Sequence, residues 1–496
     1  MAALLASAPV RAVEASGAAE PAPAHPSEVA IFSSMGTPPR GFRPSAEQLQ
    51  FLDSVQRDTF QFFWSASGPG RLTPDRAPGS DIASVAGVGF ALTSYLVGIE
   101  RGWVTRTDGA ARTRATLETL WHAPQGADAE GVSGHHGLYY HFVGGRDALR
   151  ADVSELSTID TALLMAGVLS AQVFFDRDDA VEGRIRDLAD QLYRRVDWAW
   201  ARSLRDGALL GMGWTPEDGF LDDDWRGYNE AMLLYVLALG SPTHAIAPEA
   251  WEAWTRTYRW DEGGGAPHVA FAPLFGHQYS HVWIDFRGIQ DRYMREKGID
   301  YFVNSTRATY ANRAYCLANP QGWRGYGEGV WGLTASDGPP AGGARRTRDG
   351  RNPFHGYWAR GAAGAHDAAD DGTIAPTAAG GSVPFAPEVT IPTLMAMRER
   401  FGARVYGPWG FKDAFNLSYP GGTDGEAGWF DDQHLAIDQG PILLMIENYR
   451  TGFVWDLLKR SPYVVAGLTR AGFTGGWLAR PPPASPSAAS QLEASR

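Results

Sequence analysis

The sequence predicts an all-α protein in which about a dozen helices form two concentric rings. Along the chain, helix-length segments that are apolar on nearly every side alternate with amphipathic ones. A helix that is apolar all round must be buried on all sides, so the first kind is expected in an inner ring. Strand patterns are few, and no short repeat typical of a solenoid is visible.

Composition is that of an ordinary folded chain with an acidic surface. The 496 residues could hold two to four average domains or one large toroid, and 44% of them are hydrophobic. Lys and Arg number 44 against 56 Asp and Glu, a net charge of −12, which argues against a nucleic-acid partner or a basic membrane-binding stripe. The 18 Trp, 18 Tyr and 23 Phe suit a sugar-binding cleft, although most are expected in the core. The single cysteine, Cys316, excludes an intramolecular disulfide framework and a Cys-based zinc site.

The two ends differ from the rest of the chain. Residues 1–44 and 481–496 are rich in Ala, Pro and Ser without periodicity, so we expect a signal-like segment with a disordered linker, and a disordered tail, around one domain at 45–480. The first 15 residues have the apolar stretch and small residues of a secretory signal but lack its positive start. From this signal-like start we expect a periplasmic or secreted protein, and we expect it to be a monomer. No apolar run approaches the roughly 18 residues of a membrane helix.

The first half of the domain contains five expected helices. Ser45 is suited to cap the first, which carries an apolar stripe at helical spacing. The range 81–101 is apolar nearly all round, and 105–121 is a more polar partner. The range 157–175 is again apolar, and 181–200 is its amphipathic partner.

The second half continues the alternation. A helix is expected over 225–240, ended by Gly240 and Pro242. The remaining helices are expected around Trp251 and Trp254 and over 277–297, 301–316, 387–400, 436–449 and 454–459. Loops longer than about 12–15 residues are usually functional. The long loops are 122–154, 204–224, 258–276, 319–382 and 401–435.

Three carboxylates stand at the starts of apolar helices: Asp160, Glu230 and Asp438. Glu230 shares a helix face with leucines, and apolar surroundings favour the neutral form that a general acid needs. The alternative is that the helix dipole favours an anion there, and Asp160 has a similar structural alternative because it stands at capping-box spacing from Ser157. Asp438 has the position of an N-cap, which would keep it ionised and suit it to act as a base. An acid and a base of this kind are what a glycosidase requires.

Other polar patterns carry weaker signals. His277 and His281 have metal-like spacing but no glutamate of a zinc-protease motif between them, so polar contacts to substrate or a place in the core are expected instead. Arg287 could pair with Asp285 or Asp291, or clamp a hydroxyl group. The pair Asp431-Asp432 lacks the spaced ligands of a calcium loop. We therefore predict no metal and no cofactor.

Seven runs in order resemble the bacterial glucoamylase-like family, which includes endo-β-1,2-glucanases. They are residues 157–167, 227–232, 274–287, 332–339, 384–388, 406–416 and 437–441. The resemblance extends from about residue 46 to about 475 and implies a single (α/α)6 barrel, a toroid of six helical hairpins, with long loops on one face forming the substrate cleft. It also implies cleavage of β-1,2-glucan to sophoro-oligosaccharides without a cofactor. The insertion around 340–380 matches no motif of the family.

The resemblance assigns roles by motif. Glu230 would be the acid, Asp438 the base and Asp160 a third essential carboxylate, in a reaction that inverts the anomeric centre and in which the acid can act through a substrate hydroxyl. The candidate substrate-binding residues are Trp225, Tyr228, His281, Asp285, Arg287, Trp331, Asp337, Glu388, Phe411, Trp429 and Gln439.

Two other functions stay open at this point. The chain is also similar to the cyclising domain of cyclic β-1,2-glucan synthases, which would make it a transglycosylase, and a hydrolase of another glucan is a related alternative. A non-catalytic glucan-binding protein would keep an aromatic cleft but could lose the carboxylates. The presence of all three carboxylates in their motifs favours an enzyme.

Overall fold

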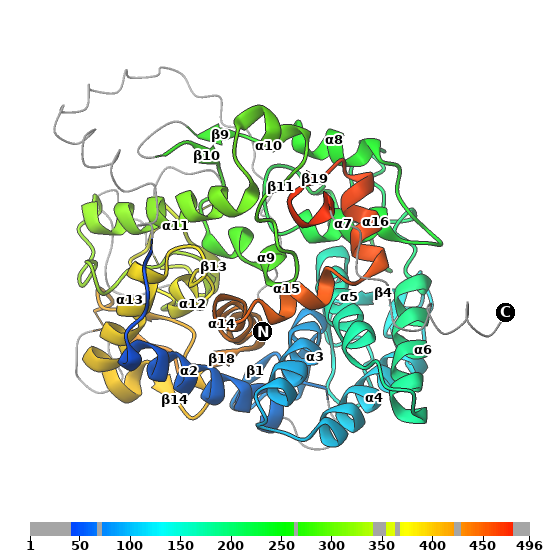
Figure 1. The fold of residues 1–496 in the computed structure, drawn as a ribbon, viewed down its shortest axis with the longest axis horizontal. Coiled ribbons are helices and arrows are strands. Elements are labelled where there is room, and N and C mark those ends of the chain that lie inside the picture. Colours follow the sequence, from blue (N-terminus) through cyan, green and yellow to red (C-terminus); the bar gives the residue numbers. More distant parts are fainter. Residues whose placement is uncertain are drawn as a thin grey trace, which may run out of the picture.

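The structure, a computed structural model, describes residues 41–66, 72–261, 266–340, 354–362, 368–420 and 428–479. Nearly all of both terminal segments, and much of the insertion around 340–380, lie outside the described residues. The chain is mainly helical, with short strands confined to the connections between helices. In Figure 1 the helix that carries Asp438 is seen end-on near the middle of the molecule, and other helices surround it.

One set of helices is buried on almost every side. It consists of α3 (Val85–Glu100), α5 (Thr158–Phe174), α7 (Met232–Gly240), α9 (Tyr279–Trp283), α12 (Pro376–Gly380) and α14 (Ala436–Arg450). Their sequences leave no polar stripe that could face water, so each must pack on neighbours all round. The expectation that the apolar helices form an interior set is confirmed for these elements.

The inner helices contact one another in a ring. Helix α3 packs on α5 and α14, α5 packs on α7, and α14 packs on α12 and α9. Close approach depends on glycine: a Cβ at Gly89 or Gly167 would lie 2.2 Å from a backbone oxygen of the facing helix. Between α9 and α12, the Gln278 side chain donates a hydrogen bond to the Ala378 carbonyl at 2.9 Å. The inner helices therefore form a closed set around a common interior.

A second set of helices covers the first and shows the amphipathic pattern expected of it. It consists of α2 (Ala46–Ser65), α4 (Arg106–His122), α6 (Ala180–Arg195), α8 (Glu249–Thr255), α10 (Arg292–Lys297), α11 (Tyr301–Ala318), α13 (Pro387–Phe401), α15 (Phe453–Leu458) and α16 (Pro462–Arg470), with 3-10 turns η1 (Leu274–His277), η2 (Gly402–Arg404) and η3 (Gly476–Ala479). Ser45 forms the expected cap of α2, as a capping box with Gln48.

The loops contain more strand than the sequence suggested. The largest sheet has the order β3 (Gly134–His135), β4 (Leu138–Tyr140), β6 (Leu156–Ser157), β7 (Gly213–Thr215) and β8 (Gly219–Phe220), all antiparallel. The other strands pair two by two: β1 (Arg76–Ala77) with β18 (His434–Leu435), β2 (Ile82–Ser84) with β5 (Phe142–Gly144), β9 (Trp260–Asp261) with β10 (His268–Val269), β11 (Ile289–Gln290) with β19 (Thr474–Gly475), β12 (Ala335–Ser336) with β13 (Trp358–Ala359), β14 (Tyr406–Gly407) with β15 (Gly410–Phe411) and β16 (Phe415–Asn416) with β17 (Trp429–Phe430). Several of these strands run directly into the helices that carry the site.

Three expected helix boundaries are wrong, each because a tertiary contact replaces a helical one. Residues 82–84 pair with β5, so α3 starts at Val85 instead of 81. Helix α7 starts at Met232 instead of 225. The Ser280 hydroxyl accepts a hydrogen bond from the Leu233 N–H at 3.0 Å and so caps the start of this helix. The expected helix 277–297 is three elements, η1, α9 and α10, separated after Trp283 by an extended segment and β11.

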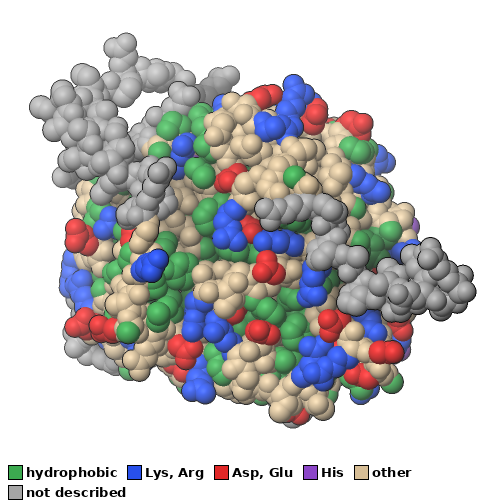
Figure 2. All heavy atoms as spheres, in the orientation of Figure 1, with side chains coloured by type: hydrophobic (Ala, Val, Ile, Leu, Met, Phe, Trp, Pro, Cys, Tyr) green, Lys and Arg blue, Asp and Glu red, His purple; other side chains and the backbone are tan. Residues whose placement is uncertain are grey.

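The outer surface mixes charges of both signs. On the face shown in Figure 2, basic and acidic side chains are interspersed with apolar ones over the described elements. Within the described ranges, no helix has both the length and the apolar run that crossing a membrane requires.

Candidate active site

The three predicted carboxylates come from three inner-ring positions and approach one another. Asp160 lies in the first turn of α5, Asp438 in the first turn of α14, and Glu230 in the turn before α7. Tyr279, the first residue of α9, lies among them: its hydroxyl donates to the Ile437 carbonyl at 3.0 Å. Burial first, and then the negative charges of Asp438, Tyr357, Glu230 and Asp160, raise the pKa of the Tyr279 hydroxyl well above its usual value.

The Glu230 carboxyl is desolvated, and one of its oxygens, Oε2, has no hydrogen-bond partner among the described groups. The Ser280 hydroxyl fixes the backbone of Glu230 by donating to its carbonyl at 3.0 Å. The interpretation of Glu230 as a residue of the first helical turn is wrong, because the helix begins two residues later. Burial, with a smaller contribution from the charge of Asp160, raises the pKa of Glu230 to about 7, against a backbone hydrogen bond that lowers it. The group is therefore a proton donor near neutral pH.

Asp160 belongs to a chain of hydrogen bonds that the sequence only partly predicts. Ser157 caps α5 by accepting from the Asp160 N–H at 3.2 Å, as the capping-box spacing indicates, and its hydroxyl also donates to the Asp160 carboxylate. His141 lies 2.9 Å from Glu155 through Nδ1 and 3.6 Å from Asp160 through Nε2. Although burial acts to lower it, the pKa of His141 rises to about 9 because of Asp160 and Glu155. His141 is thus an imidazolium ion between two carboxylates at neutral pH.

Asp438 has acidic neighbours instead of apolar ones. Its side chain is hydrogen-bonded to the Asp413 carboxyl, and Asp413 in turn accepts from the Asp337 N–H at 2.6 Å. Arg76 binds Asp337 at 2.8 Å and Asp75 at 3.3 Å. Burial raises the pKa of Asp438 to about 7, although the hydrogen bond from Asp413 acts to lower it.

The prediction that Asp438 caps its own helix and is little desolvated is therefore wrong. The cap residue is Leu435, which is held in β18 by pairing with Arg76 of β1. The Ala436 N–H donates to the Asp75 carbonyl at 2.8 Å, so a backbone oxygen from another segment serves the helix start. Asp438 is the third helical residue, and its side chain is free to turn towards Asp413.

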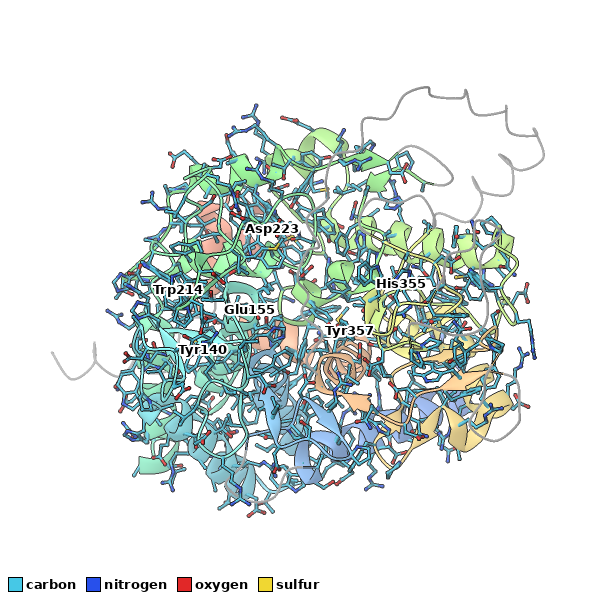
Figure 3. All side chains as sticks on the ribbon, turned by 180° about the vertical axis from the view of Figure 1, so that it is seen from behind. Tyr140, Glu155, Trp214, Asp223, His355 and Tyr357 are labelled. Carbon is cyan, nitrogen blue, oxygen red and sulfur yellow. The ribbon has the colours of Figure 1, made fainter. Side chains whose placement is uncertain are left out.

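The residues labelled in Figure 3 show how the connections around the site are arranged. In Figure 3, which shows the face opposite to that of Figure 1, Glu155 and Tyr357 lie near the middle of the ring. Tyr140 and Trp214 lie on the side of the five-stranded sheet, and His355 lies on the other side. Trp214 is half-buried and belongs to a group of aromatic rings with His135 and Trp200, at centroid distances of 5.4 and 5.9 Å. Flat rings of this kind at a cleft suit sugar faces.

Of the predicted substrate-binding residues, Asp337 alone is linked to the catalytic carboxylates by the contacts described above. Most of the others are core residues whose polar atoms bind protein. Trp225 donates to Thr158 at 2.9 Å, Trp331 donates to Thr393 at 2.7 Å, and Gln439 donates to the Phe411 carbonyl at 2.8 Å. Phe411 and Gln439 are fully buried. These residues contribute to the framework, and their contact with a substrate stays a prediction.

The tyrosine and histidine of the same set are also buried. Tyr228 stacks on Tyr301 at a centroid distance of 5.9 Å, and His281 lies 3.1 Å from the Ser305 hydroxyl with no exposed surface. Burial lowers the pKa of both His281 and His277 to about 3, so both rings are neutral, and the interpretation as core residues is the correct one.

The remaining members of the set lie elsewhere. Asp285 binds Arg287 at 2.7 Å and Lys459 at 2.8 Å, so the plain ion pair is the correct alternative for Arg287, and both residues follow the end of α9 away from Tyr279. Glu388 accepts from Tyr310 and lies beside Tyr449, near the end of α14 opposite to Asp438. Trp429 is half-buried in β17.

The structure adds residues that sequence reasoning missed. They are Asp75, Arg76, His141, Glu155, Tyr279, Tyr357, Asp413 and Asp431. Asp413 lies inside the family-like run 406–416, so that run contained a signal for it. Asp75 and His141 stand in loops without any motif, and only the pairing of β1 with β18 and β4 with β6 brings them to the site.

The acidic neighbours of Asp438 approach one another closely. Asp337, Asp413 and Asp431 each place a carboxylate oxygen within 4.8 Å of the others. Asp337 already binds Arg76, and Asp413 is hydrogen-bonded to Asp438. Burial and the charges of Asp413 and Asp337 raise the pKa of Asp431 to about 8, which is the behaviour of carboxyl groups that share protons. Arg76 and protons shared among these carboxyl groups can both reduce the negative charge of this cluster, whose oxygens also lie close enough to hold a metal ion.

Comparison with known proteins gives a consistent set of relatives. Residues 222–462 match the Glycoamylase family model, described as "Putative glucoamylase". The exo-β-1,2-glucooligosaccharide sophorohydrolase (non-reducing end) of Parabacteroides distasonis is 30% identical over 451 residues. That match includes 85% of this chain, and the chain spans 57% of the length of that relative.

Two solved structures share the fold over their whole length. A Bacteroides uniformis protein solved under the same glucoamylase description is 33% identical, with a TM-score of 0.73, over 88% of this chain and 100% of its own. The endo-β-1,2-glucanase of Chitinophaga pinensis, solved as a complex with sophorotriose and glucose, is 28% identical, with a TM-score of 0.74 and the same coverage.

Proposed function

The chain belongs to the glucoamylase-like family, and from that premise we propose that it is a glycoside hydrolase that cleaves β-1,2-glucan to sophoro-oligosaccharides. The observation that carries the proposal is that two desolvated carboxyl groups, Glu230 and Asp438, both act on the Tyr279 hydroxyl while having different neighbours: Glu230 is influenced by Asp160, and Asp438 is hydrogen-bonded to Asp413. The substrate is proposed from the relatives, which include an exo-acting sophorohydrolase and an endo-β-1,2-glucanase.

The proposed reaction divides the work between the two carboxyl groups. Glu230, neutral below about pH 7, protonates the glycosidic oxygen directly or through a substrate hydroxyl. Asp438, in its ionised form, takes a proton from a water molecule that attacks the anomeric carbon from the opposite face. The C–O bond to the leaving sugar breaks as the bond to water forms, and the configuration is inverted. Asp160, beside Glu230 and paired with the His141 imidazolium, is a negative charge that favours the proton on Glu230.

The fold part of the proposal is an (α/α)6 barrel. In the part of the chain that the structure describes, six buried helices alternate with helices of the outer set, in the pairs α2/α3, α4/α5, α6/α7, α8/α9, α11/α12 and α13/α14. This alternation supports six hairpins with the carboxylates at one end of the inner ring.

We further propose that the protein acts as a monomer after export to the periplasm or the medium. The signal-like residues at the N-terminus support export. Light scattering on the purified protein tests the first part, and N-terminal sequencing of protein recovered from cell fractions tests the second.

Product analysis tests the activity. Linear β-1,2-glucan is incubated with the enzyme, and the products are separated by thin-layer chromatography, with Glu230→Gln as the control. Short linear sophoro-oligosaccharides are expected from the wild type alone. Cyclic products would indicate a transglycosylase, and binding without any product would indicate a glucan-binding protein; either result contradicts the proposal.

A further inference from the structure

Asp413 occupies a position that the proposed reaction does not use. It lies between β15 and β16, is 1% exposed, and is hydrogen-bonded to Asp438, which is 3% exposed. One of its oxygens, Oδ2, accepts from the Asp337 N–H at 2.6 Å. Its backbone is fixed as well, because the Asp413 N–H donates to the Gln433 carbonyl at 2.9 Å.

The contact between the two carboxyl groups needs a proton. Neither Asp413 Oδ1 nor Asp438 Oδ2 has an N–H or O–H donor among the described groups, and both atoms are buried. A carboxylate has only acceptor oxygens, so two ionised groups in contact would repel and leave both oxygens unsatisfied. One proton between them converts the repulsion into an O–H···O⁻ hydrogen bond, which is among the strong ones.

The surroundings decide which carboxyl keeps the proton. The charged and titratable groups that face the pair from the packed elements are Asp75, Arg76, Tyr279, Asp337, Tyr357 and Asp431. Arg76 is the single cation in that set; it favours the ionised form of Asp438 and also interacts with Asp413. At Asp413, burial and the charges of Asp438 and Asp337 outweigh it and raise the pKa well above the usual range.

We infer that Asp413 is a positioning residue that stays protonated and donates a hydrogen bond to Asp438, so that the base remains anionic and correctly turned although it is buried. This inference rests on the proposed role of Asp438 as the base. Asp413 acts through Asp438 and needs no contact with the substrate. Two variants of Asp413 test whether its carboxyl group is protonated and donates a hydrogen bond, or is ionised.

The first test is the acidic limb of the rate profile, kcat/KM against pH, on β-1,2-glucan. Asp413→Asn keeps a neutral donor of the same shape, so the limb is expected to stay within about 0.3 pH units and the rate to fall less than about tenfold. Asp413→Leu has no donor and leaves Asp438 desolvated without support, so the limb is expected to move up by about one pH unit or more. An Asn variant whose limb moves down by a similar amount would mean that Asp413 is ionised, which would overturn the inference.

The second test does not depend on activity, and so it separates this inference from the proposed function. Infrared difference spectra of wild type minus Asp413→Asn at pH 7.5 are expected to contain the C=O stretching band of a protonated carboxyl group. Absence of that band overturns the inference even if the enzyme cleaves the glucan, and its presence supports the inference even if no glucan is cleaved. Loss of activity in wild-type enzyme treated with a chelator, restored by a divalent cation, would also overturn it, since the cluster would then hold a metal. Circular dichroism melting curves check that each variant is folded.

Discussion

Glu230 and Asp438 have raised pKa values of about 7, yet they reach them in opposite kinds of surroundings. Around Glu230, burial is the largest cause, and the charge of Asp160 adds a smaller contribution. Around Asp438, burial combines with neighbouring carboxylates and is opposed by Arg76 and by the hydrogen bond from Asp413. A group of the first kind easily keeps its proton, whereas a group of the second kind has a donor and a cation that support its anion. Similar pKa values therefore serve different roles.

The largest expected effect is on turnover. Glu230→Gln and Asp438→Asn each remove one proton-transferring group without changing its shape, so kcat should fall by about 10²–10⁴-fold in each. Initial rates on β-1,2-glucan measure this, with the exposed Asp456→Asn as a matched control that should keep wild-type activity. Near-normal rates in either variant would remove that residue from its assigned role.

The next effect is on stability, and its size distinguishes the two surroundings. The folded Glu230 carboxyl titrates at about 7, above its unfolded value of about 4.3, so the folded state binds the proton more tightly. Stability is therefore lost as pH rises from about 4 to 7. Glu230→Gln removes this loss, and we expect it to raise the free energy of unfolding at pH 8 by at most about 4 kcal/mol and not at pH 4.

Denaturant unfolding of the wild type and of Glu230→Gln at the two pH values measures that difference. Asp438→Asn serves as the comparison. We expect it to raise the free energy of unfolding at pH 8 by less than Glu230→Gln does, because the substitution also removes the anion that interacts favourably with Arg76. Equal effects in the two variants would contradict the contrast between their surroundings.

His141 tests the cationic side of the same site. Its pKa rises to about 9 in the folded state, so its charge stabilises the fold below the unfolded value of about 6.5, and this contribution is lost as pH rises through 9. His141→Gln should therefore destabilise the protein at pH 6, by at most about 3 kcal/mol, and hardly at pH 9.5. NMR titration of the ring checks the cause directly, since a pKa of 6.5 or less would contradict the imidazolium between Glu155 and Asp160.

The smallest effect is expected at Arg287. Its ion pair with the buried Asp285 lies beyond the end of α9, and Lys459 still pairs with Asp285 when Arg287 is removed, so Arg287→Ala should change stability by about 1 kcal/mol and kcat/KM by less than about twofold. Arg76→Ala is the contrasting change, because Arg76 supports the Asp438 cluster. An Arg287 variant that lost activity while keeping its melting temperature would restore the substrate-clamp interpretation.

The sequence predicted well what depends on local patterning. The apolar helices, the cap at Ser45, the Ser157–Asp160 contact and the three inner carboxylates are all read from periodicity and spacing along one segment. It predicted poorly what depends on pairing between distant segments. Asp75, His141 and Asp413 reach the site through strands of two or three residues, which have no periodicity to detect.

Motif membership alone does not indicate substrate contact, for a physical reason. Trp331 and Gln439 lie in or beside family-like runs, and their N–H groups bind Thr393 and the Phe411 carbonyl inside the core. A buried polar atom without its partner is costly, so a structural role alone gives such residues a reason to be kept. The state of Asp438 also escaped prediction, because the expected N-cap position depended on the start of α14, which β18 sets.

Azide rescue tests the central division of roles most directly. Asp438→Ala leaves room for a small anion at the place of the base, while Glu230 can still protonate the leaving oxygen. With sodium azide and a β-1,2-linked substrate, the account predicts recovery of activity and an α-glycosyl azide, of configuration opposite to the substrate, as identified by NMR. A β-glycosyl azide, or rescue confined to Glu230→Ala, would contradict it, because the first result requires a nucleophile and the second requires the roles to be exchanged.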